Sequence, residues 1–293
     1  MQPRSFGTHD GSFHADEVTA CSLLLLVDLI DRDKIHRTRD PKILAKCEYV
    51  CDVGGVYDPQ IKRFDHHQVD YQGSLSSAGM VLNYLKEKEF VSQSFYNFLH
   101  HSLIKGVDAH DNGVEMCQDG VTSFSDVVSN FLPIDYNSNA KERFYSFLEA
   151  AEFVFNHLKR LRNRFLYTKE CKDKVKETMA KNKLYLEFDE PLPWIDNFFD
   201  LKGEEHPALY VIMPTGDHWK LRGIPPNSKD RMKVRLPLPK KWAGLRDHEL
   251  QQVSGIEGAI FCHKGQFISI WENKKDAFAA MHKIFKEHGI TEK

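Results

Sequence analysis

The sequence contains no CxxC motif, although it has six cysteines. They are Cys21, Cys47, Cys51, Cys117, Cys171 and Cys262. Most of them stand in apolar stretches, so we expect no disulfide framework and interpret them as reduced thiols of a cytoplasmic protein. A zinc site at Cys47 and Cys51 is disfavoured, because no second cysteine pair accompanies them.

The sequence also lacks a hydrophobic run long enough to cross a bilayer. The longest apolar run, at residues 23–26, is interrupted by Ser22 and Asp28. No basic segment followed by an apolar one stands at the N-terminus, so neither a signal peptide nor a membrane partner is expected. Neither sign of charge is in excess, since the sequence has 40 Lys and Arg and 42 Asp and Glu. This balance does not favour a long polyanionic partner, although a local basic cleft is compatible with it.

The chain of 293 residues is long enough for two domains. Over residues 1–138, short apolar strands alternate with helical patterns, which predicts an α/β domain with a mainly parallel sheet flanked by helices. The expected strands are 5–8, 35–38 and 48–53, and the expected helices are 16–30, 76–88 and 94–105. Ligands of such sheets bind beyond the carboxyl ends of the strands.

The remaining chain changes pattern twice. Residues 139–183 keep helical spacing of apolar residues as far as Phe165 and then become highly charged, which predicts a long connecting helix with a solvated second half. Residues 184–293 contain short strand-like segments, such as ALYVIMP and FISIW, and a terminal amphipathic helix at 276–286. This pattern predicts a smaller α+β domain at the C-terminal end.

Histidines and carboxylates gather in the first domain at predicted strand ends and helix ends. The clusters are His9 with His14-Ala-Asp16, the isolated Asp52, Asp65-His66-His67, and Asp108. Buried charges of this kind are costly unless cations compensate them. A mixture of imidazole and carboxylate suits Mn, Fe, Co or Zn better than Ca, so the joint pattern predicts a metal site.

Two features at helix starts allow two interpretations each. Glu17 either supports a ligand or is a first-turn carboxylate that the helix dipole favours. Ser76 and Ser77 either cap a helix or offer its free N–H groups to a phosphate, and capping is the commoner role.

The order of the motifs resembles the DHH phosphoesterase superfamily and, more closely, the melanocyte-proliferating-gene-one family of metal-dependent hydrolases. The motifs are GTHDGSFHADE, CDVGGVYDP…RFDHHQ, LSSAG and GVDAHDNG, followed far downstream by RLPLPKKWAGLRDHEL and GIEGAIFCHKGQF. They extend over nearly the whole chain. The superfamily includes RecJ-type exonucleases, oligoribonucleases and manganese-dependent pyrophosphatases, and eukaryotic members of the closer family are described as 3′–5′ RNA exonucleases. The resemblance therefore implies a DHH-type catalytic domain over residues 1–138.

The resemblance implies two divalent metal ions, with manganese expected and Fe, Co or Zn as alternatives. The implied ligands are His9, His14, Asp16, Asp52, His66 and Asp108, with Asp52 bridging the two ions. Asp52 and His67 are the implied catalytic residues. His67 would bind a phosphate oxygen or assist the leaving group, and Asp65 would orient a histidine. Asp10 receives no role.

In the superfamily the C-terminal lobe holds the substrate. Arg235 and His263 lie in family-like stretches and are the first candidates for phosphate contacts. Further candidates are Ser77, Arg222, Arg231, Arg246 and Lys264, and the aromatic residues Trp219, Trp242 and Phe267 are candidates for stacking on bases. The sequence QFISIW after Gly265 departs from the glycines that relatives carry there.

The expected function is that of a manganese-dependent phosphodiesterase, a 3′–5′ exonuclease acting on RNA or short oligonucleotides. One alternative is a small-molecule phosphohydrolase acting on pyrophosphate, a phosphoadenosine or a cyclic dinucleotide, which the near-neutral charge favours. Another is a metal-stabilised binding protein without turnover. A homo-oligomer is compatible with the sequence.

Overall fold

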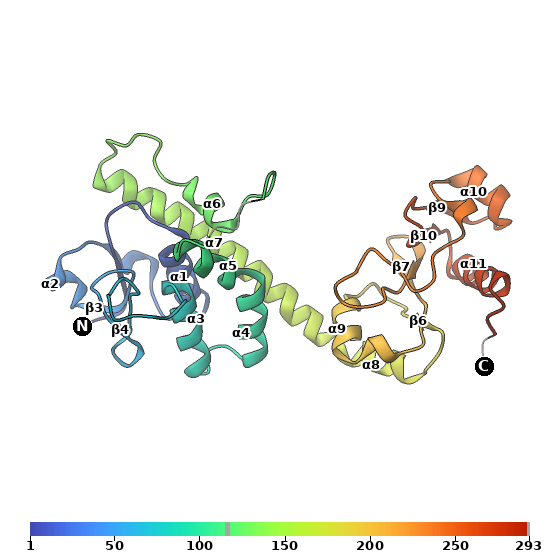
Figure 1. Ribbon diagram of the computed structural model, residues 1–293, viewed down its shortest axis with the longest axis horizontal. Coiled ribbons are helices and arrows are strands. Elements are labelled where there is room, and N and C mark those ends of the chain that lie inside the picture. The colour runs from blue at the N-terminus through green and yellow to red at the C-terminus, as the bar shows by residue number, and fades with distance from the viewer. Residues whose placement is uncertain (115–117, 292–293) are drawn as a thin grey trace. The chain divides into compact units, whose positions relative to one another are not determined.

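The computed structural model describes residues 1–114 and 118–291, so Cys117 lies outside the described residues. The chain divides into two compact units, Met1–Phe165 and Leu166–Lys293. Each unit contains one five-stranded sheet with helices packed on it (Figure 1). This arrangement confirms the predicted fold class. In the described part of the chain no helix is long and apolar enough to span a membrane.

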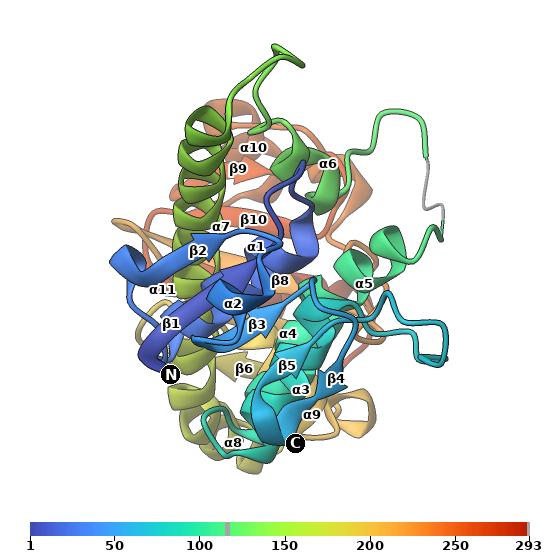
Figure 2. The ribbon, with the colours of Figure 1, turned by 90° about the vertical axis from the view of Figure 1, so that its left-hand side faces the viewer.

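The sheet of the first unit is mainly parallel, as the sequence predicted. Its strand order is β2-β1-β3-β5-β4 (Figure 2). The central β1 pairs in parallel with β2 and β3, β3 pairs in parallel with β5, and β4 is antiparallel to β5. The strands are β1 (Gln2–Thr8), β2 (Ile35–Arg37), β3 (Cys47–Cys51), β4 (Tyr57–Asp58) and β5 (Arg63–Phe64).

Helices cover the two faces of this sheet unequally. The main core joins one face to α1, α3 and the first part of α7, whereas α2 and β3 form a small cluster of Leu44, Cys47, Val50 and Val53. The helix α1 is buried almost all round, which explains its apolar composition. The helices are α1 (Ala15–Leu26), α2 (Pro41–Leu44), α3 (Ser77–Glu87), α4 (Gln93–Leu99), α5 (Lys105–Asp111) and α6 (Phe124–Ser129).

The helix predicted at 94–105 is longer and is interrupted. A π-helical turn, His100–Ile104, joins α4 to α5, which continues to Asp111. Such turns occur mostly as single insertions within α-helices and often lie near functional sites.

The segment predicted as one connecting helix is divided in two. The helix α7 (Ala140–Glu170) packs Phe147, Val154 and Leu158 into the first core, and α8 (Lys172–Ala180) follows after Cys171. Val175 and Met179 of α8 are buried in a core of the second unit. The charged half is therefore solvated on one side only, because its charges leave one apolar face that packs in the core shared with β6 and β7.

In the sheet of the second unit β6 is parallel to β7 and the other pairs are antiparallel. The strand order is β6-β7-β8-β10-β9. The helix α11 packs on β7, β8 and β10, and α8 and α9 share a second core with β6 and β7 (Figure 1). The elements are β6 (Tyr185–Glu187), α9 (Ile195–Asp200), β7 (Tyr210–Thr215), β8 (His218–Gly223), α10 (Asp247–Ser254), β9 (Ala259–Cys262), β10 (Ile268–Trp271) and α11 (Lys274–Glu287).

Candidate metal centre

The histidine and carboxylate clusters follow the carboxyl ends of three parallel strands. His9 comes directly after β1, Asp52 directly after β3, and Asp65-His66-His67 directly after β5. Because these strands are parallel neighbours, their carboxyl ends meet at one edge of the sheet. The start of α1 brings further carboxylates to the same edge.

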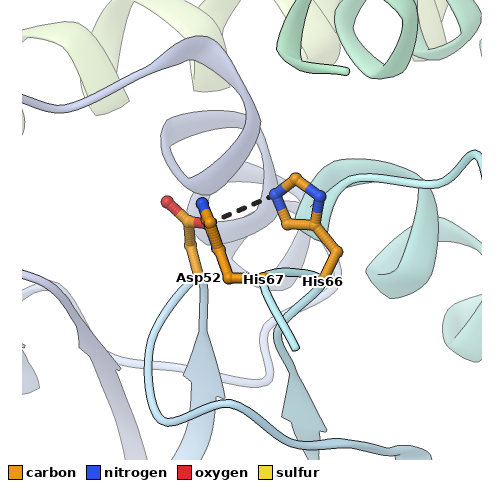
Figure 3. A group of neighbouring side chains, drawn as sticks. All are labelled: Asp52, His66 and His67. Carbon is orange, nitrogen blue, oxygen red and sulfur yellow. Dashed lines mark ion pairs between the residues drawn. The ribbon is translucent and has the colours of Figure 1, made fainter. Parts of the chain in front are cut away.

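Asp52 lies at the middle of this arrangement. Its Oδ2 is 3.1 Å from Nε2 of His9, and its Oδ1 is 3.5 Å from Nε2 of His66 and 3.3 Å from Nδ1 of His67. Figure 3 shows both rings of the double histidine beside the carboxylate. The two oxygens of Asp52 therefore face different imidazoles.

The backbone at Asp52 is left-handed, with φ of 58°. Gly54 and Gly55 also have positive φ. Aspartate tolerates this conformation better than most residues, and such backbone persists where the surroundings hold it in place. The N–H of Asp52 donates to the carbonyl of Phe64 over 3.0 Å, which fixes the end of β3 against β5.

In the described part of the chain, three groups of side chains bring ligand atoms within 4.8 Å of one another. They are Asp52 with His66 and His67, His9 with Glu17 and Asp52, and His14 with Asp16 and Asp111. Asp52 belongs to two of them. Within residues 1–114 and 118–291, four buried atoms of this cluster find no hydrogen-bond partner: Asp16 Oδ1, Glu17 Oε1, Asp52 Oδ1 and His66 Nε2. Such convergent atoms fit a cation, and their mixed N and O chemistry suits a transition metal.

The electrostatics of the cluster also favour a cation. Burial raises the pKa of Asp16 well above its usual range, and the neighbouring carboxylates of Glu17, Asp52 and Asp111 add to the rise. Burial alone would lower the pKa of His66, but the nearby carboxylates of Asp111 and Asp52 raise it to about 10. Without metal, protons on imidazoles supply the positive charge that the carboxylates require. A divalent ion would replace those protons.

Asp52 is the candidate for a bridging ligand, and its pKa is also set by its neighbours rather than by burial. Burial would raise the pKa of Asp52, yet the imidazoles of His66 and His9 beside the carboxylate lower that pKa to about 2. Asp52 therefore stays ionised, as a ligand shared between two sites must.

Asp111 was not predicted from the sequence and lies inside the cluster. Its Oδ2 is 2.9 Å from Nε2 of His66, and its Oδ1 is 3.7 Å from Nδ1 of His14. Asp108, the ligand implied by the resemblance, lies outside. The two aspartates share a face of α5, because they are three residues apart. That spacing in GVDAHDNG was the available signal for Asp111.

Asp108 instead closes the start of α3. Its Oδ1 accepts hydrogen bonds from the N–H of Ser76 (3.1 Å), the hydroxyl of Ser76 (2.7 Å) and the N–H of Gly79 (3.0 Å). Asp108, which the resemblance implied as a ligand, is not among the grouped ligand atoms: its Oδ1 is used by the free N–H groups of a helix, and its Oδ2 is buried without a hydrogen-bond partner among the described residues.

Two predicted supporting residues contact the cluster. Asp65 Oδ1 is 2.9 Å from Nδ1 of His67, and Asp65 Oδ2 accepts from the N–H of Gly55 over 2.6 Å. Glu17 has both of the roles considered for it. Its Oε2 accepts from the N–H of His14 at the start of α1 over 2.9 Å, and its Oε1 lies 3.0 Å from Nε2 of the candidate ligand His9.

Ser77 is not free to bind substrate. It is fully buried, and its hydroxyl donates to the carbonyl of Phe64 over 2.7 Å. Its N–H approaches Asp16 Oδ2 at 3.3 Å. Ser77 therefore ties the start of α3 to β5 and to the cluster.

Arg235 is also corrected, because its guanidinium is used within the second unit. It donates to the carbonyls of Gly203, Glu204, His206, Ala208 and Pro225, and lies over the ring of Phe198. These bonds occupy all of its N–H groups. Arg231 pairs with Asp196.

The aromatic residues considered for stacking on bases differ in their burial. Trp242 is fully buried in the core of the second unit, and Trp219 packs against that core. Neither is free to stack on a base. Arg222, Arg246, His263, Lys264 and Phe267 are half-buried or exposed in the second unit.

The contact between α3 and α5 leaves no room for a side chain at Gly79. A Cβ there would lie 2.3 Å from Asp108 Oδ2 and 2.7 Å from Oδ1. We expect Gly79→Ala to lower the free energy of unfolding by about 1–3 kcal/mol in denaturant titrations. The control is Gly106→Ala in α5, where a Cβ meets nothing within 4 Å. Equal unfolding midpoints for the two variants would contradict this tight contact.

Comparison with known proteins tests the family resemblance. The chain matches the model of the uncharacterised protein family UPF0160 over residues 5–284. It is 52% identical over 289 residues to the MYG1 protein of Chlamydia trachomatis and covers 99% of each chain. It is 33% identical over 298 residues to a MYG1 protein of Schizosaccharomyces pombe, covering 89% of this chain and 91% of the relative. It is 31% identical over 310 residues to the MYG1 exonuclease of Rattus norvegicus, covering 92% and 81%.

Among solved structures, RecJ from Thermus thermophilus in complex with Mn²⁺ aligns with 98% of this chain and 52% of its own. The TM-score is 0.27 and the identity 12%, so this likeness carries no conclusion about fold or activity. The family relationship rests on the family model and on the relatives that align over nearly the whole chain, and these confirm the resemblance of the motifs. The chain belongs to the UPF0160 family, together with the MYG1 proteins and MYG1 exonucleases that it matches.

Proposed function

We propose that this chain, a metal-dependent hydrolase of the MYG1 exonuclease family, removes nucleotides from the 3′ end of RNA or short oligonucleotides with two divalent metal ions, manganese being the expected one. The observation that carries the proposal is the position of Asp52, which belongs to two groups of metal-ligand atoms at once. The printed names of several relatives, including those of rat and human, are MYG1 exonuclease.

The side chains around Asp52 divide into two sets of donors. His9 faces Oδ2 of Asp52, and His66 faces Oδ1 with Asp111 on its other side. His14 and Asp16 have ligand atoms within 4.8 Å of Asp111, so they adjoin the second set. Divalent ions held there would lower the pKa of a water molecule and neutralise the charge that develops on a phosphoryl group.

His67 is suited to contact the substrate. Its Nδ1 faces Asp65, so Nε2 is left for a phosphate oxygen or the leaving group. The side chain is 61% exposed, in contrast to the 8% of His66. We assign His67 the role of a proton donor or phosphate contact rather than a required ligand.

Covalent catalysis by the nearest thiols is disfavoured. Cys51 directly precedes Asp52 but is fully buried, and burial raises the pKa of its thiol well above the usual range. A thiol held protonated is a poor nucleophile. Direct attack by water on the phosphodiester therefore fits the site better.

A small-molecule phosphohydrolase is the second candidate, and the net charge of −2 favours it. The test is an assay of metal-stripped protein reloaded with Mn²⁺, Mg²⁺, Co²⁺ or Zn²⁺ against 5′-labelled RNA, 5′-labelled DNA, dinucleotides and pyrophosphate. We expect a ladder of 5′-labelled RNA products that shortens with time, fastest with Mn²⁺. Immediate release of the labelled 5′ nucleotide would contradict the polarity, and hydrolysis of pyrophosphate alone would support the second candidate.

A further inference from the structure

The carboxyl end of β2 lies at the same edge of the first sheet as the metal cluster. β2 is parallel to β1, and Thr8, the last residue of β1, pairs with Arg37, the last residue of β2. Because His9 follows Thr8 directly, Arg37 stands beside the start of the segment that carries the first candidate ligand. We call residues 9–14, which join β1 to α1, the His9 loop.

The His9 loop has few hydrogen bonds of its own. Among the described residues, no backbone-to-backbone hydrogen bond involves residues 10–13. The backbone N of Gly11 contacts Nδ1 of His9 over 3.2 Å, and the N–H of His14 donates to Glu17 at the start of α1. A ligand carried by such a loop needs supporting contacts from elsewhere to keep its direction.

The side chain of Arg37 supplies contacts of this kind. Its Nε donates to the carbonyl of His9 over 3.1 Å, and its Nη2 donates to the carbonyl of Gly11 over 2.5 Å. The guanidinium also lies over the ring of Phe13, 5.5 Å from the centre of that ring. Arg37 therefore contacts residues 9, 11 and 13, which are alternate residues of the His9 loop.

The helix α7 holds Arg37 from another side. Nη1 of Arg37 donates to the carbonyl of Arg143 over 3.1 Å, and the guanidinium lies 5.0 Å from the centre of the Phe147 ring. Phe147 is fully buried, and its ring meets that of Phe13 edge-on, with centroids 5.7 Å apart. The planar guanidinium is thus fixed against two rings and three carbonyls, which gives its donors set directions.

These contacts determine where the ring of His9 lies. Its Nε2 is 3.1 Å from Oδ2 of Asp52 and 3.0 Å from Oε1 of Glu17. Its Nδ1 faces the backbone N of Gly11. The carbonyls of His9 and of Gly11 are both bound to one guanidinium, so a shift of either carbonyl would move the ring relative to Asp52.

We propose that Arg37 is a positioning residue of the metal centre, which holds the His9 loop so that Nε2 of His9 stays directed at Asp52. Contacts behind a metal ligand orient it and raise the affinity of the site for the metal. Arg37 acts through the loop and touches no reacting atom. The inference rests on the proposed function for the presence of a bound metal, but it concerns the affinity for that metal and not the substrate.

The charge of Arg37 and its position have opposite effects on metal binding. Burial lowers the pKa of Arg37, and the nearby carboxylate of Glu17 opposes that change. A cation this close to the candidate ligands repels a divalent ion. Removal of the charge alone would therefore strengthen metal binding, whereas loss of positioning would weaken it. The sign of the change separates the two roles.

The experiment titrates the metal-free full chain with Mn²⁺ alone and measures the free ion by electron paramagnetic resonance. We expect Arg37→Lys, which keeps the charge but loses the fork of donors, to raise the Kd for Mn²⁺ by about 10- to 100-fold. Arg37→Ala should raise this Kd at least as much. Millimolar guanidinium should restore part of the affinity of Arg37→Ala, because the ion can occupy the space between the two rings.

Arg63→Lys is the matched control. Arg63 is also half-buried, and its guanidinium donates to four backbone carbonyls, those of residues 47, 48, 61 and 62. Residues 47 and 48 lie at the amino end of β3, opposite the end that carries Asp52. We expect denaturant titrations of the metal-free proteins to show a loss of stability in both lysine variants, and the Kd for Mn²⁺ to change in Arg37→Lys alone.

Unchanged Kd values in both Arg37 variants would overturn the inference and leave the proposed function standing. Tighter Mn²⁺ binding by Arg37→Ala would do the same, because the charge would then be the dominant effect. Equal loss of affinity in Arg63→Lys would also overturn the inference, since affinity would follow general stability. A wild type that binds no Mn²⁺ would overturn the proposed function as well. If Arg37→Ala does not fold, Arg37→Lys decides the outcome.

Discussion

Asp52→Ala is expected to remove at least one bound metal ion and to lower hydrolysis by about 10³-fold or more, since even supporting partners of ligands contribute about 10- to 100-fold. The physical reason is the position of the carboxylate. Its two oxygens face His9 on one side and His66 with His67 on the other. Without this anion the repulsion between two cations is uncompensated.

Metal content and hydrolysis of Asp52→Ala should be measured side by side with three further variants. Asp52→Asn removes the charge but keeps a residue that tolerates the left-handed backbone. His67→Ala should keep the metal and lose turnover. Asp10→Ala is the control, because Asp10 is exposed and lies 3.5 Å from Arg39. Retention of two metals and substantial activity by Asp52→Ala would remove the bridging assignment.

Asp111→Ala is expected to lower the affinity of the site for Mn²⁺ by about 10²-fold or more, whereas Asp108→Ala keeps metal binding and loses about 1–3 kcal/mol of stability. Asp111 Oδ2 lies 2.9 Å from Nε2 of His66, while Asp108 Oδ1 accepts three hydrogen bonds at the start of α3. The two effects separate because one carboxylate faces the cluster and the other faces a helix end.

The pair is compared by a Mn²⁺ binding titration and by denaturant unfolding of the metal-free proteins. Each variant serves as the control for the other, since both remove a carboxylate from the same helix. The opposite result, with metal affinity lost in Asp108→Ala and kept in Asp111→Ala, would restore the ligand set implied by the family resemblance.

The strand ends of the site were predictable because local patterns encode them. An apolar run followed by Asp52 and two glycines ends a strand, and His9 follows the predicted strand 5–8. The short strand β5 before the double histidine was not among the predicted strands. Parallel pairing of the strands brings their carboxyl ends together.

The choice between Asp108 and Asp111 was not predictable, because it depends on how α5 is rotated against its neighbours. Three donors at the start of α3 hold Asp108, and those donors come from residues some thirty positions earlier in the chain. Arg235 illustrates the same limit. Its motif suggested a phosphate contact, whereas the carbonyls that occupy it come from residues 203–208 and Pro225.

The π-helical turn His100–Ile104 sets the directions in which the side chains of α5 point around the helix axis. A turn of this kind holds one residue more than a turn of α-helix, and each residue of an α-helix advances the side chains by about 100°. A uniform α-helix extended from Phe95 and Leu99 would therefore carry Asp111 roughly 100° away from the direction it takes here. With the π turn, Asp111 instead lies within about 30° of the direction of Leu99, on the same side as the buried Val107. One inserted residue thus keeps a carboxylate of the cluster in line with the face by which α4 and α5 pack.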